Sequence, residues 1–342
     1  MARTTIATGA DLSPIIVQRQ LFLEQKKNAY FTRFFSASGD MPVFEKTDFT
    51  KAKGETMTFG LRIRLTGAAI EGNTTVKGKE DKLTFYSYKL TLQRYRYAVQ
   101  DDGSLTRQRF VGDIPTESRN ALTVWGGEFI DQKCMNALTA SPTKIVYGGV
   151  ATSVTGASTA GLNAATEYLT PKKISAIKAV ATTQRGSGET PIQPVMVDGK
   201  KYFVLLVSPD VAVDLKYDTT FMAAIREAAE RGSNNPLFTG MLGVWDGVVI
   251  HEHENVPVLS NGGAAGNVAY SKCIFMGASA LCWAWGERPS IVEEDEDYEE
   301  FKGYCWRMTA AVGKPVFNSK DHGSIAVYVT DSRATGRTTN IA

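Results

Sequence analysis

The feature that most constrains this chain is a long stretch of alternating side chains between residues 51 and 100. From Thr56 to Leu65 every second residue is apolar. Successive side chains of a strand point to opposite faces, so this pattern predicts a half-buried β-strand. After a glycine-rich turn segment, a second strand is expected from about Leu83 to Val99. The parity of its large residues changes near Gln93–Arg94, which predicts a bulge or bend there. Together the two strands predict a long hairpin.

The predicted hairpin needs a partner surface, because an isolated two-stranded ribbon is only marginally stable in water. That partner is either the body of its own chain or a neighbouring copy. Residues 51–99 contain ten basic and four acidic side chains, a net charge of +6, whereas the whole chain has +2, which leaves −4 for the rest. Oppositely charged regions on one molecule suit head-to-tail contacts between copies. A nucleic-acid-binding arm is the alternative interpretation of the same charge.

A long helix is predicted over about residues 113–139, where apolar residues recur at steps of three and four. Asp113 or Thr116 can cap it, and Pro115 suits its first turn. A helix of about 25 residues is about 37 Å long and would act as a strut. Gly126 and Gly127 weaken it, which predicts close packing against another backbone at that point.

Shorter elements are expected in the second half of the chain. Helices are predicted after the capping residues Thr170, Ser208 and Asp218 or Thr219. The unbroken apolar run Lys201–Val207 predicts a buried strand, and a β-rich return ends in a strand over Ser324–Thr330.

Three segments are expected to lack a continuous element. Residues 141–165 are expected to form a loop between two lobes, and residues 331–342 a polar tail. Residues 1–50 form either an arm that packs on something else or, around Val17–Tyr30, a helix on their own core.

The motifs of common catalytic sites are absent from the sequence: it has no phosphate-binding GxxxxGK[ST] loop, no GxGxxG and no GxSxG. The best candidate for a metal site is His251-Glu252-His253, because both histidines would share one face of a strand. His322 is the only other histidine, so ordinary surface histidines are the preferred interpretation. The acidic run Glu293–Glu300 lacks the spacing of a calcium loop and predicts a solvated loop. No catalytic residue, cofactor or metal ligand is therefore predicted.

The composition excludes some classes of protein. With 43% hydrophobic and 22% charged residues the chain can build a core and is not intrinsically disordered. Four widely spaced cysteines indicate buried thiols in a reducing compartment. The longest apolar stretch, Ile274–Trp285, is shorter than the roughly 20 residues that cross a bilayer, so no membrane partner is expected.

Several short motifs occur in an order that resembles one protein family. They are Gly54-Glu55 with the strand Met57–Leu65; Tyr202–Pro209 with Asp214-Leu215 and Asp218; Asn235–Gly240 with Gly243 and Gly247-Val248; Gly277 with Ala280, Ala284 and Gly286; and Lys314, Phe317 and Asp321-His322-Gly323. Over about residues 10–330 the chain resembles the major capsid proteins of tailed bacteriophages, which have the HK97-type fold, and in particular the family named after the capsid protein of N4-like phages.

The resemblance implies an α+β fold with five regions. These would be an N-terminal arm (1–50), an extended β-hairpin loop (51–100), a peripheral domain with a spine helix (101–145), an axial domain (146–300), and return strands of the peripheral domain with a C-terminal tail (301–342). It also implies a virion protein, assembled in the host cytoplasm, that forms hexamers and pentamers of an icosahedral head around double-stranded DNA. Portal, scaffold and decoration proteins of the phage are the implied further partners, and the packaged DNA would be contacted without sequence specificity.

The basic hairpin and the acidic run suggest how copies would contact each other. We expect the inter-subunit residues to be apolar and basic positions of the hairpin and acids of the run, namely Phe59, Leu61, Arg62, Ile63, Arg64, Arg94, Arg96, Glu293, Glu294 and Asp295. The alternative functions are another virion structural protein, such as a tail or decoration protein, and a nucleic-acid-binding protein that uses the same hairpin.

Overall fold

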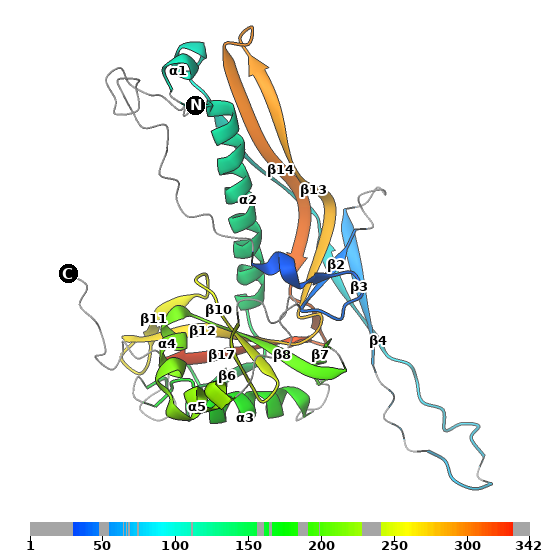
Figure 1. The fold of residues 1–342 in the computed structure, drawn as a ribbon. Coiled ribbons are helices and arrows are strands. Elements are labelled where there is room, and N and C mark those ends of the chain that lie inside the picture. Colours follow the sequence, from blue (N-terminus) through cyan, green and yellow to red (C-terminus); the bar gives the residue numbers. More distant parts are fainter. Residues whose placement is uncertain are drawn as a thin grey trace.

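The structure is a computed structural model, and it describes most of the chain. The described residues are 30–47, 55–63, 65, 67, 69–73, 75–110, 112–155, 161–163, 166–183, 191–197, 199–227 and 241–330. Figure 1 shows two lobes joined by one long helix, with a narrow ribbon and a long loop that project to one side. We call the two lobes the helix lobe and the sheet lobe.

The helix lobe is a five-stranded sheet covered by the long helix α2. The strand order is β1-β2-β13-β14-β5. Its strands are β1 (Phe35–Ser36), β2 (Val43–Lys46), β13 (Leu281–Glu296), β14 (Phe301–Gly313) and β5 (Gln93–Gln100). The antiparallel hairpin of β13 and β14 is the longest part of the sheet, and α2 runs beside it (Figure 1). A 3-10 turn, η1 (Phe31–Phe34), and a short helix, α1 (Ser104–Arg109), complete the lobe.

The predicted strut helix is confirmed as α2 (Ile114–Thr139), which at 26 residues is about 39 Å long. Its apolar side packs on the sheet through Leu122 and Ile130. A neighbouring backbone was expected beside Gly126, but this glycine faces the indole ring of Trp306 instead. A Cβ atom at this position would lie 2.7 Å from Cε2 of that ring. The glycine is therefore needed so that a buried tryptophan can lie against the helix.

The sheet lobe is an eight-stranded sheet with helices on one face. Its main path is β6-β17-β12-β8-β10-β9, and β11 and β7 pair with β12 and β8. The strands are β6 (Ile145–Tyr147), β7 (Val195–Val197), β8 (Lys200–Val207), β9 (Met241–Trp245), β10 (Val248–Glu252), β11 (Val258–Gly262), β12 (Val268–Met276) and β17 (Ser324–Thr330). The helices are α3 (Pro171–Thr182), α4 (Pro209–Tyr217) and α5 (Thr219–Glu227).

The unbroken apolar run of β8 is explained by burial on both of its faces. Phe203 and Leu205 pack toward α3 and α4, whereas Val204 and Leu206 belong to the core that includes the lower end of α2. Three of the predicted helix caps are also confirmed, whereas Asp113 precedes α2 without a side-chain capping hydrogen bond and instead accepts one from the Thr116 hydroxyl. Thr170 and Ser208 accept hydrogen bonds from the backbone N–H groups of Lys173 and Val211, at 3.3 and 3.4 Å. Asp218 caps α5 in the same way.

The predicted hairpin is shorter than expected, because its second strand divides between two sheets. β3 (Thr56–Arg62) pairs with β4 (Phe85–Thr91) as a separate two-stranded ribbon. The strand is interrupted at Leu92, and the following strand, β5, pairs with β14 of the helix lobe instead. The change of parity predicted near Gln93–Arg94 marks this transfer between sheets.

Two strands pair in a different lobe from the one that the expected regions assigned to them. β13 falls in the region expected to be axial (146–300), yet it pairs with β14 and β2 in the helix lobe. β17 falls in the region expected to return to the peripheral domain (301–342), yet it pairs with β12 and β6 in the sheet lobe. The segment expected to be a loop at 141–165 also supplies β6. The helix considered around residues 17–30 and the tail at 331–342 lie outside the described residues.

Candidate assembly surfaces

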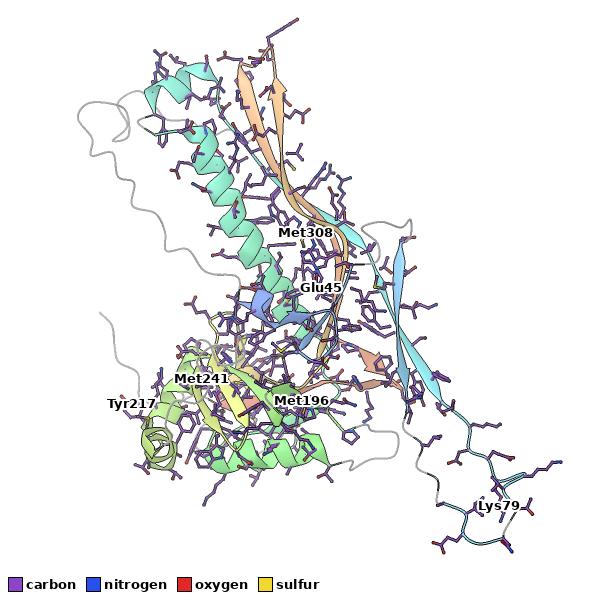
Figure 2. The ribbon with its side chains drawn as sticks, turned by 45° about the vertical axis from the view of Figure 1, so that its right-hand side comes forward. Glu45, Lys79, Met196, Tyr217, Met241 and Met308 are labelled. Carbon is purple, nitrogen blue, oxygen red and sulfur yellow. The ribbon has the colours of Figure 1, made fainter. Side chains whose placement is uncertain are left out.

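The most exposed part of the described chain is the segment Ile63–Thr84 between β3 and β4, which we call the extended loop. Figure 2 shows Lys79 at its far end, away from both lobes. Large apolar side chains of the loop and of its junction with β4 are exposed: Leu65 by 55%, Val76 by 58%, Leu83 by 53% and Phe85 by 66%. Apolar surface gathered on one projecting segment is typical of a contact with another molecule.

The apolar base of the ribbon packs on its own chain, which corrects the expectation that it needs a neighbouring copy. Met57, Phe59 and Leu90 are buried in a cluster with Cys282, Ala284 and Ala311 of β13 and β14. Phe59 also makes an edge-on contact with the ring of Phe44, at 5.7 Å between ring centres.

Leu61 and Ile63, the other two apolar candidates, are half-buried. They line a small cavity with Phe317 and His322, beside β15 (Val316–Phe317) and β16 (Lys320–Asp321). The exposed apolar side chains therefore lie farther along the extended loop, at Leu65, Val76 and Leu83.

The described basic candidates do not lie on the extended loop: Arg62 ends β3 opposite Phe85, and Arg94 and Arg96 lie on β5. Arg62, Arg94 and Arg96 are exposed, while Arg64 lies outside the described residues. On β5, Arg96 stands directly opposite Arg307 of β14, and Arg307 forms an ion pair with Glu287 at 3.1 Å. In contrast, the described part of the extended loop has three basic and three acidic side chains: Lys77, Lys79, Lys82, Glu71, Glu80 and Asp81.

The acidic candidates lie at the opposite end of the helix lobe. The run Glu293–Glu300 is only in part the loop that was expected: Glu293–Glu296 form the end of β13, and residues 297–300 form the turn into β14. Glu293 forms an ion pair with Arg119 of α2, with Nη2 and Oε1 2.6 Å apart, and Asp295 lies 3.9 Å from Lys302. Glu294 is exposed. One chain therefore does not bring these acids near the predicted arginines, and pairing between copies stays a prediction.

The turn itself is fastened to α1. Glu300 accepts hydrogen bonds from the backbone and hydroxyl groups of Ser104, at 2.9 and 2.8 Å, and these lower the pKa of its carboxyl. Beside it, buried Asp101 accepts a 2.5 Å hydrogen bond from Arg107. These contacts hold the tip of the helix lobe together within one chain.

His251 is buried and His253 is half-buried, which corrects the interpretation of both as surface histidines. His251 is fully buried and makes edge-on ring contacts with Tyr30 and Phe34, both at 5.7 Å between ring centres. The ring of His253 lies 4.7 Å from that of Tyr30. Within the described ranges no three His, Cys, Asp or Glu side chains are grouped so that they could hold a metal ion. The two histidines instead pack the start of the described chain against β10.

Two buried carboxylates had been given no structural role in the sequence analysis. Asp131 of α2 accepts hydrogen bonds from the backbone N–H groups of Tyr30 and Phe31, at 2.6 and 2.9 Å. Burial is the largest influence on its pKa, which is raised. The signal was present in the sequence, because Asp131 falls between the apolar helix positions Ile130 and Cys134.

The second carboxylate, Asp321, forms a buried ion pair with Lys314, at 2.9 Å. The Lys314 ammonium also donates to the carbonyl oxygens of Ala140 (2.9 Å) and Ser141 (3.5 Å), just after the end of α2. The pair thus fixes the chain where α2 leads into the sheet lobe.

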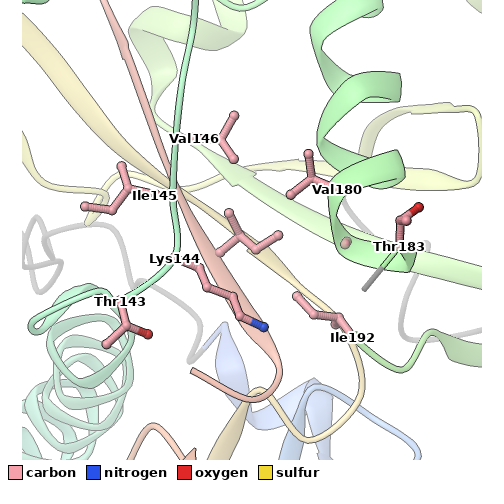
Figure 3. A pocket seen from close by; sticks show the side chains of 9 residues that line it. Thr143, Lys144, Ile145, Val146, Val180, Thr183 and Ile192 are labelled. Carbon is pink, nitrogen blue, oxygen red and sulfur yellow. The ribbon is translucent and has the colours of Figure 1, made fainter. Parts of the chain in front are cut away.

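A cavity of about 230 Å³ lies between β6 and the end of α3, and Figure 3 shows the side chains that line it. Aliphatic side chains such as Ile145, Val180 and Ile192 form most of this lining. Among the described lining residues Lys144 is the one with a charge, and none of them forms a pair suited to acid–base or nucleophilic chemistry. Among the helices of the described ranges, none is both long and apolar enough to cross a bilayer.

Comparison with known proteins identifies the architecture. The family model described as "Phage capsid protein" matches residues 5–333. The major capsid protein of Pseudomonas phage KPP25 is 26% identical, over 90% of this chain and 93% of that protein. The capsid of Ralstonia phage GP4 has a TM-score of 0.83 at 26% identity and full coverage of both chains.

More distant structures share the fold alone. The capsid protein of cyanophage Pam1 has a TM-score of 0.78 at 22% identity, over 97% of this chain and 99% of that chain. The predicted HK97-type fold is confirmed, while the narrower N4-like assignment stays a prediction. The chain belongs to the phage capsid protein family.

Proposed function

We propose that this chain is the major subunit of an icosahedral phage head, that it forms the hexamers and pentamers of the shell, and that the shell encloses double-stranded DNA. Membership of the family makes it a virion structural component that self-associates. Assembly in the host cytoplasm, together with portal, scaffold and possible decoration proteins, belongs to the same proposal.

The observation that carries the proposal is the contrast between a well-anchored body and an unpartnered projection. The two lobes share one core, Asp131 of α2 accepts hydrogen bonds from the backbone of Tyr30 and Phe31, and the buried pair of Lys314 and Asp321 fastens the chain just after the end of α2. The extended loop exposes large apolar side chains instead of burying them on this body. A second copy that covers them would stabilise the contact by about 25 cal/mol for each Å² of apolar surface that it buries. The same contribution would be repeated at every contact of a shell.

Charge pairing between copies is the weaker part of the attraction. A single exposed ion pair contributes only about 0–1 kcal/mol. Glu293 already has Arg119 as a partner within its own chain. We therefore assign most of the assembly free energy to apolar contacts of the extended loop, and assign register and orientation to the charges at Arg62, Arg94 and Arg96.

The test replaces exposed side chains only, because an aspartate at buried Phe59 would disrupt the fold of the subunit itself. The variant Leu65→Ser/Val76→Ser/Leu83→Ser should keep the circular dichroism and unfolding midpoint of the parent subunit but form no closed particles in negative-stain micrographs. Asn73→Ser, in the same loop, is the matched control and should assemble normally. Particles of normal size from the triple variant would refute the role of the loop.

The nucleic-acid alternative is less well supported, because the described part of the extended loop has balanced charge. Among the described hairpin residues, Arg62 at the end of β3 and Arg94 and Arg96 on β5 are exposed and could contact phosphates. Binding of duplex DNA to the unassembled subunit, followed by fluorescence anisotropy, decides between the two. We expect affinity weaker than micromolar at physiological salt; tight binding that falls steeply with salt would favour the alternative.

A further inference from the structure

The outer edge of β5 is the open end of the sheet in the helix lobe. β5 is last in the strand order, and among the described residues β14 is the one strand that pairs with it. The outer edge of such a strand presents a row of backbone N–H and C=O groups with which another strand can pair. The edge of Gln93–Gln100 is therefore a surface to which a further strand can be added.

The ladder with β14 shows which residues of β5 direct their backbone groups outward. Asp101 follows the pair of Gln100 and Gly303, and its backbone N–H donates to the carbonyl oxygen of Lys302 at 3.0 Å. Hydrogen-bonded and non-hydrogen-bonded pairs alternate along an antiparallel ladder. Residues of odd number in β5 therefore direct their backbone groups toward β14, whereas residues of even number, from Arg94 to Gln100, direct theirs to the open edge.

An exposed aromatic side chain lies on this edge strand. Tyr97 is 47% exposed, although its ring stacks on that of Trp125 in α2, at 4.3 Å between ring centres. Trp125 stacks in turn on Phe129, at 5.0 Å. The column of rings thus covers one face of the Tyr97 ring and leaves aromatic surface exposed on the edge strand. Aromatic residues are enriched in contacts between proteins.

The other face of β5 limits which strand can pair with it. Side chains alternate along a strand, so Arg94, Arg96 and Ala98 lie on the face away from Tyr97 and α2, and all three are exposed. Charged side chains on an edge prevent pairing with unsuitable strands, because like charges directly opposite each other are destabilising. A partner strand must therefore place an uncharged or acidic residue opposite each arginine.

The β5 strand of a second copy meets this requirement in one antiparallel register, in which a two-fold axis passes through Tyr97. Arg96 then lies opposite Ala98 of the second copy, and Arg94 lies opposite Gln100. The two Tyr97 side chains lie opposite each other, as an aromatic cross-strand pair. The strand is therefore complementary to itself in both charge and shape.

The neighbouring registers are less favourable. Outward-directed residues must face one another, so the axis passes through a residue and not between two. An axis at Tyr95 places Arg94 opposite Arg96, and an axis at Arg96 places that arginine opposite itself. An axis at Ala98 pairs only the residues from Arg96 to Gln100, because the strand ends there.

We propose that the β5 edges of two copies pair around a two-fold axis at Tyr97, so that the five-stranded sheets of two helix lobes form one continuous sheet. This inference rests on the proposed function, because an icosahedral shell places copies side by side around two-fold axes, and it names one surface through which they meet. A two-fold contact uses the same patch on both copies. The partner's strand and aromatic ring would cover the exposed side of Tyr97.

The test is disulfide cross-linking between copies in assembled particles. In the proposed pair Tyr97 occupies a non-hydrogen-bonded position, where the two Cα atoms are about 4.5 Å apart. Two cysteines at that distance can form a disulfide. The variant Tyr97→Cys is made in a Cys305→Ser background, which lacks the half-buried native thiol. Copper phenanthroline with air, in which oxygen takes up the two electrons and two protons that each thiol pair loses, should convert it to covalent dimers.

Tyr95→Cys in the same background is the matched control, because it replaces a tyrosine on the same strand and the same face. The register separates the two copies of residue 95 by four positions, about 14 Å along the strand, which is too far for a disulfide. On non-reducing gels Tyr97→Cys should give at least about fivefold more dimer than this control. Ala98→Pro removes one outward N–H, a change that edge strands tolerate, and should lower the dimer yield of Tyr97→Cys toward that of the control.

A second pair of variants serves if Tyr97→Cys forms no particles. Arg96→Cys and Ala98→Cys replace exposed side chains outside the aromatic column and face each other in the proposed register. Particles mixed from these two variants should give more dimer than particles of either one alone. Equal amounts of dimer in the three preparations would refute the register.

The remaining outcomes separate this inference from the shell function. Equal yields from Tyr97→Cys and Tyr95→Cys, or no dimer from either in particles of normal size, would overturn the pairing and leave the shell function intact. More dimer from Tyr95→Cys would overturn the axis at Tyr97. Failure of the unaltered protein to form particles would overturn the shell function. Dimers of free Tyr97→Cys subunits would then still support the pairing, and their absence would overturn it as well.

Discussion

Replacement of Lys314 by methionine tests the joint between α2 and the sheet lobe. The side chains of Lys314 and Asp321 are 5% and 1% exposed, and their charged atoms lie 2.9 Å apart. Methionine keeps an unbranched, flexible side chain of similar length but removes the ammonium. Asp321 would then be a buried carboxylate whose remaining hydrogen bond comes from the backbone N–H of Thr143, at 2.8 Å. The carbonyl oxygens of Ala140 and Ser141 would lose their donor as well.

The expected loss follows from this geometry. Removal of one partner of a buried ion pair costs about 3–5 kcal/mol, because it leaves an uncompensated charge. Single domains have free energies of unfolding of about 5–15 kcal/mol, so the variant would lose a large fraction of its stability. In Lys314→Met/Asp321→Asn the charge is gone, yet the amide oxygen still accepts from Thr143. That double variant should lose only about 1–2 kcal/mol of stability, because the hydrogen bonds from Lys314 to the carbonyl oxygens of Ala140 and Ser141 are still missing.

The assay is urea denaturation of the unassembled subunit, followed by tryptophan fluorescence. Lys216→Met is the matched control, because its ion pair with Glu252 is 3.2 Å long but 47% and 39% exposed, and it should cost less than about 1 kcal/mol. The reasoning is refuted if Lys314→Met costs no more than this control. It is also refuted if the double variant is as unstable as the single one, because the coupling between the two charges would then be absent.

Three further predictions follow from buried groups. Gly126→Ala should lower the free energy of unfolding by about 1–3 kcal/mol despite a better helix propensity, since the methyl group overlaps the buried ring of Trp306; unchanged stability in urea would contradict this. Burial and the nearby charge of Lys144 lower the pKa of His322 below 6.5. Its contribution to stability is therefore fully present above pH 6.5 and is lost as pH falls toward the lowered value, so His322→Gln should flatten the decline in unfolding free energy as the pH falls below 6.5. Cys305 is half-buried while the other three thiols are buried, so Ellman's reagent should modify one cysteine of the folded subunit quickly and four after denaturation; two fast thiols would be inconsistent with the structure.

The local elements were largely predictable, because the forces that select them act between residues close in sequence. The spacing of Leu122, Ile130 and Leu138 predicted α2 within a residue at its ends. Ser208 predicted the start of α4 through a hydrogen bond that spans three residues. The alternation from Thr56 to Arg62 predicted β3 and the face that it buries.

The partners of those elements were less predictable. A strand pattern shows which face is apolar but not which surface covers that face. Phe59 illustrates this: its burial was expected, but a neighbouring copy was assigned as its partner, whereas β13 and β14 of its own chain cover it. The same applies to His251, which was expected on the surface and lies under the ring of Tyr30.

The sequence by itself determined the helices and strands, the absence of recognisable catalytic motifs, and the resemblance to a capsid family. Only the tertiary structure showed that β13 belongs to the helix lobe and β17 to the sheet lobe. It also showed that Gly126 makes room for Trp306, and that Lys314 pairs with Asp321 beside the end of α2. The physical reason is the range of the interactions. Propensity and periodicity act over a few residues, whereas sheet pairing joins segments as far apart as Val43 and Leu281, and the Lys314 ammonium reaches the carbonyl oxygen of Ala140, 174 residues away. A local pattern is compatible with many such pairings.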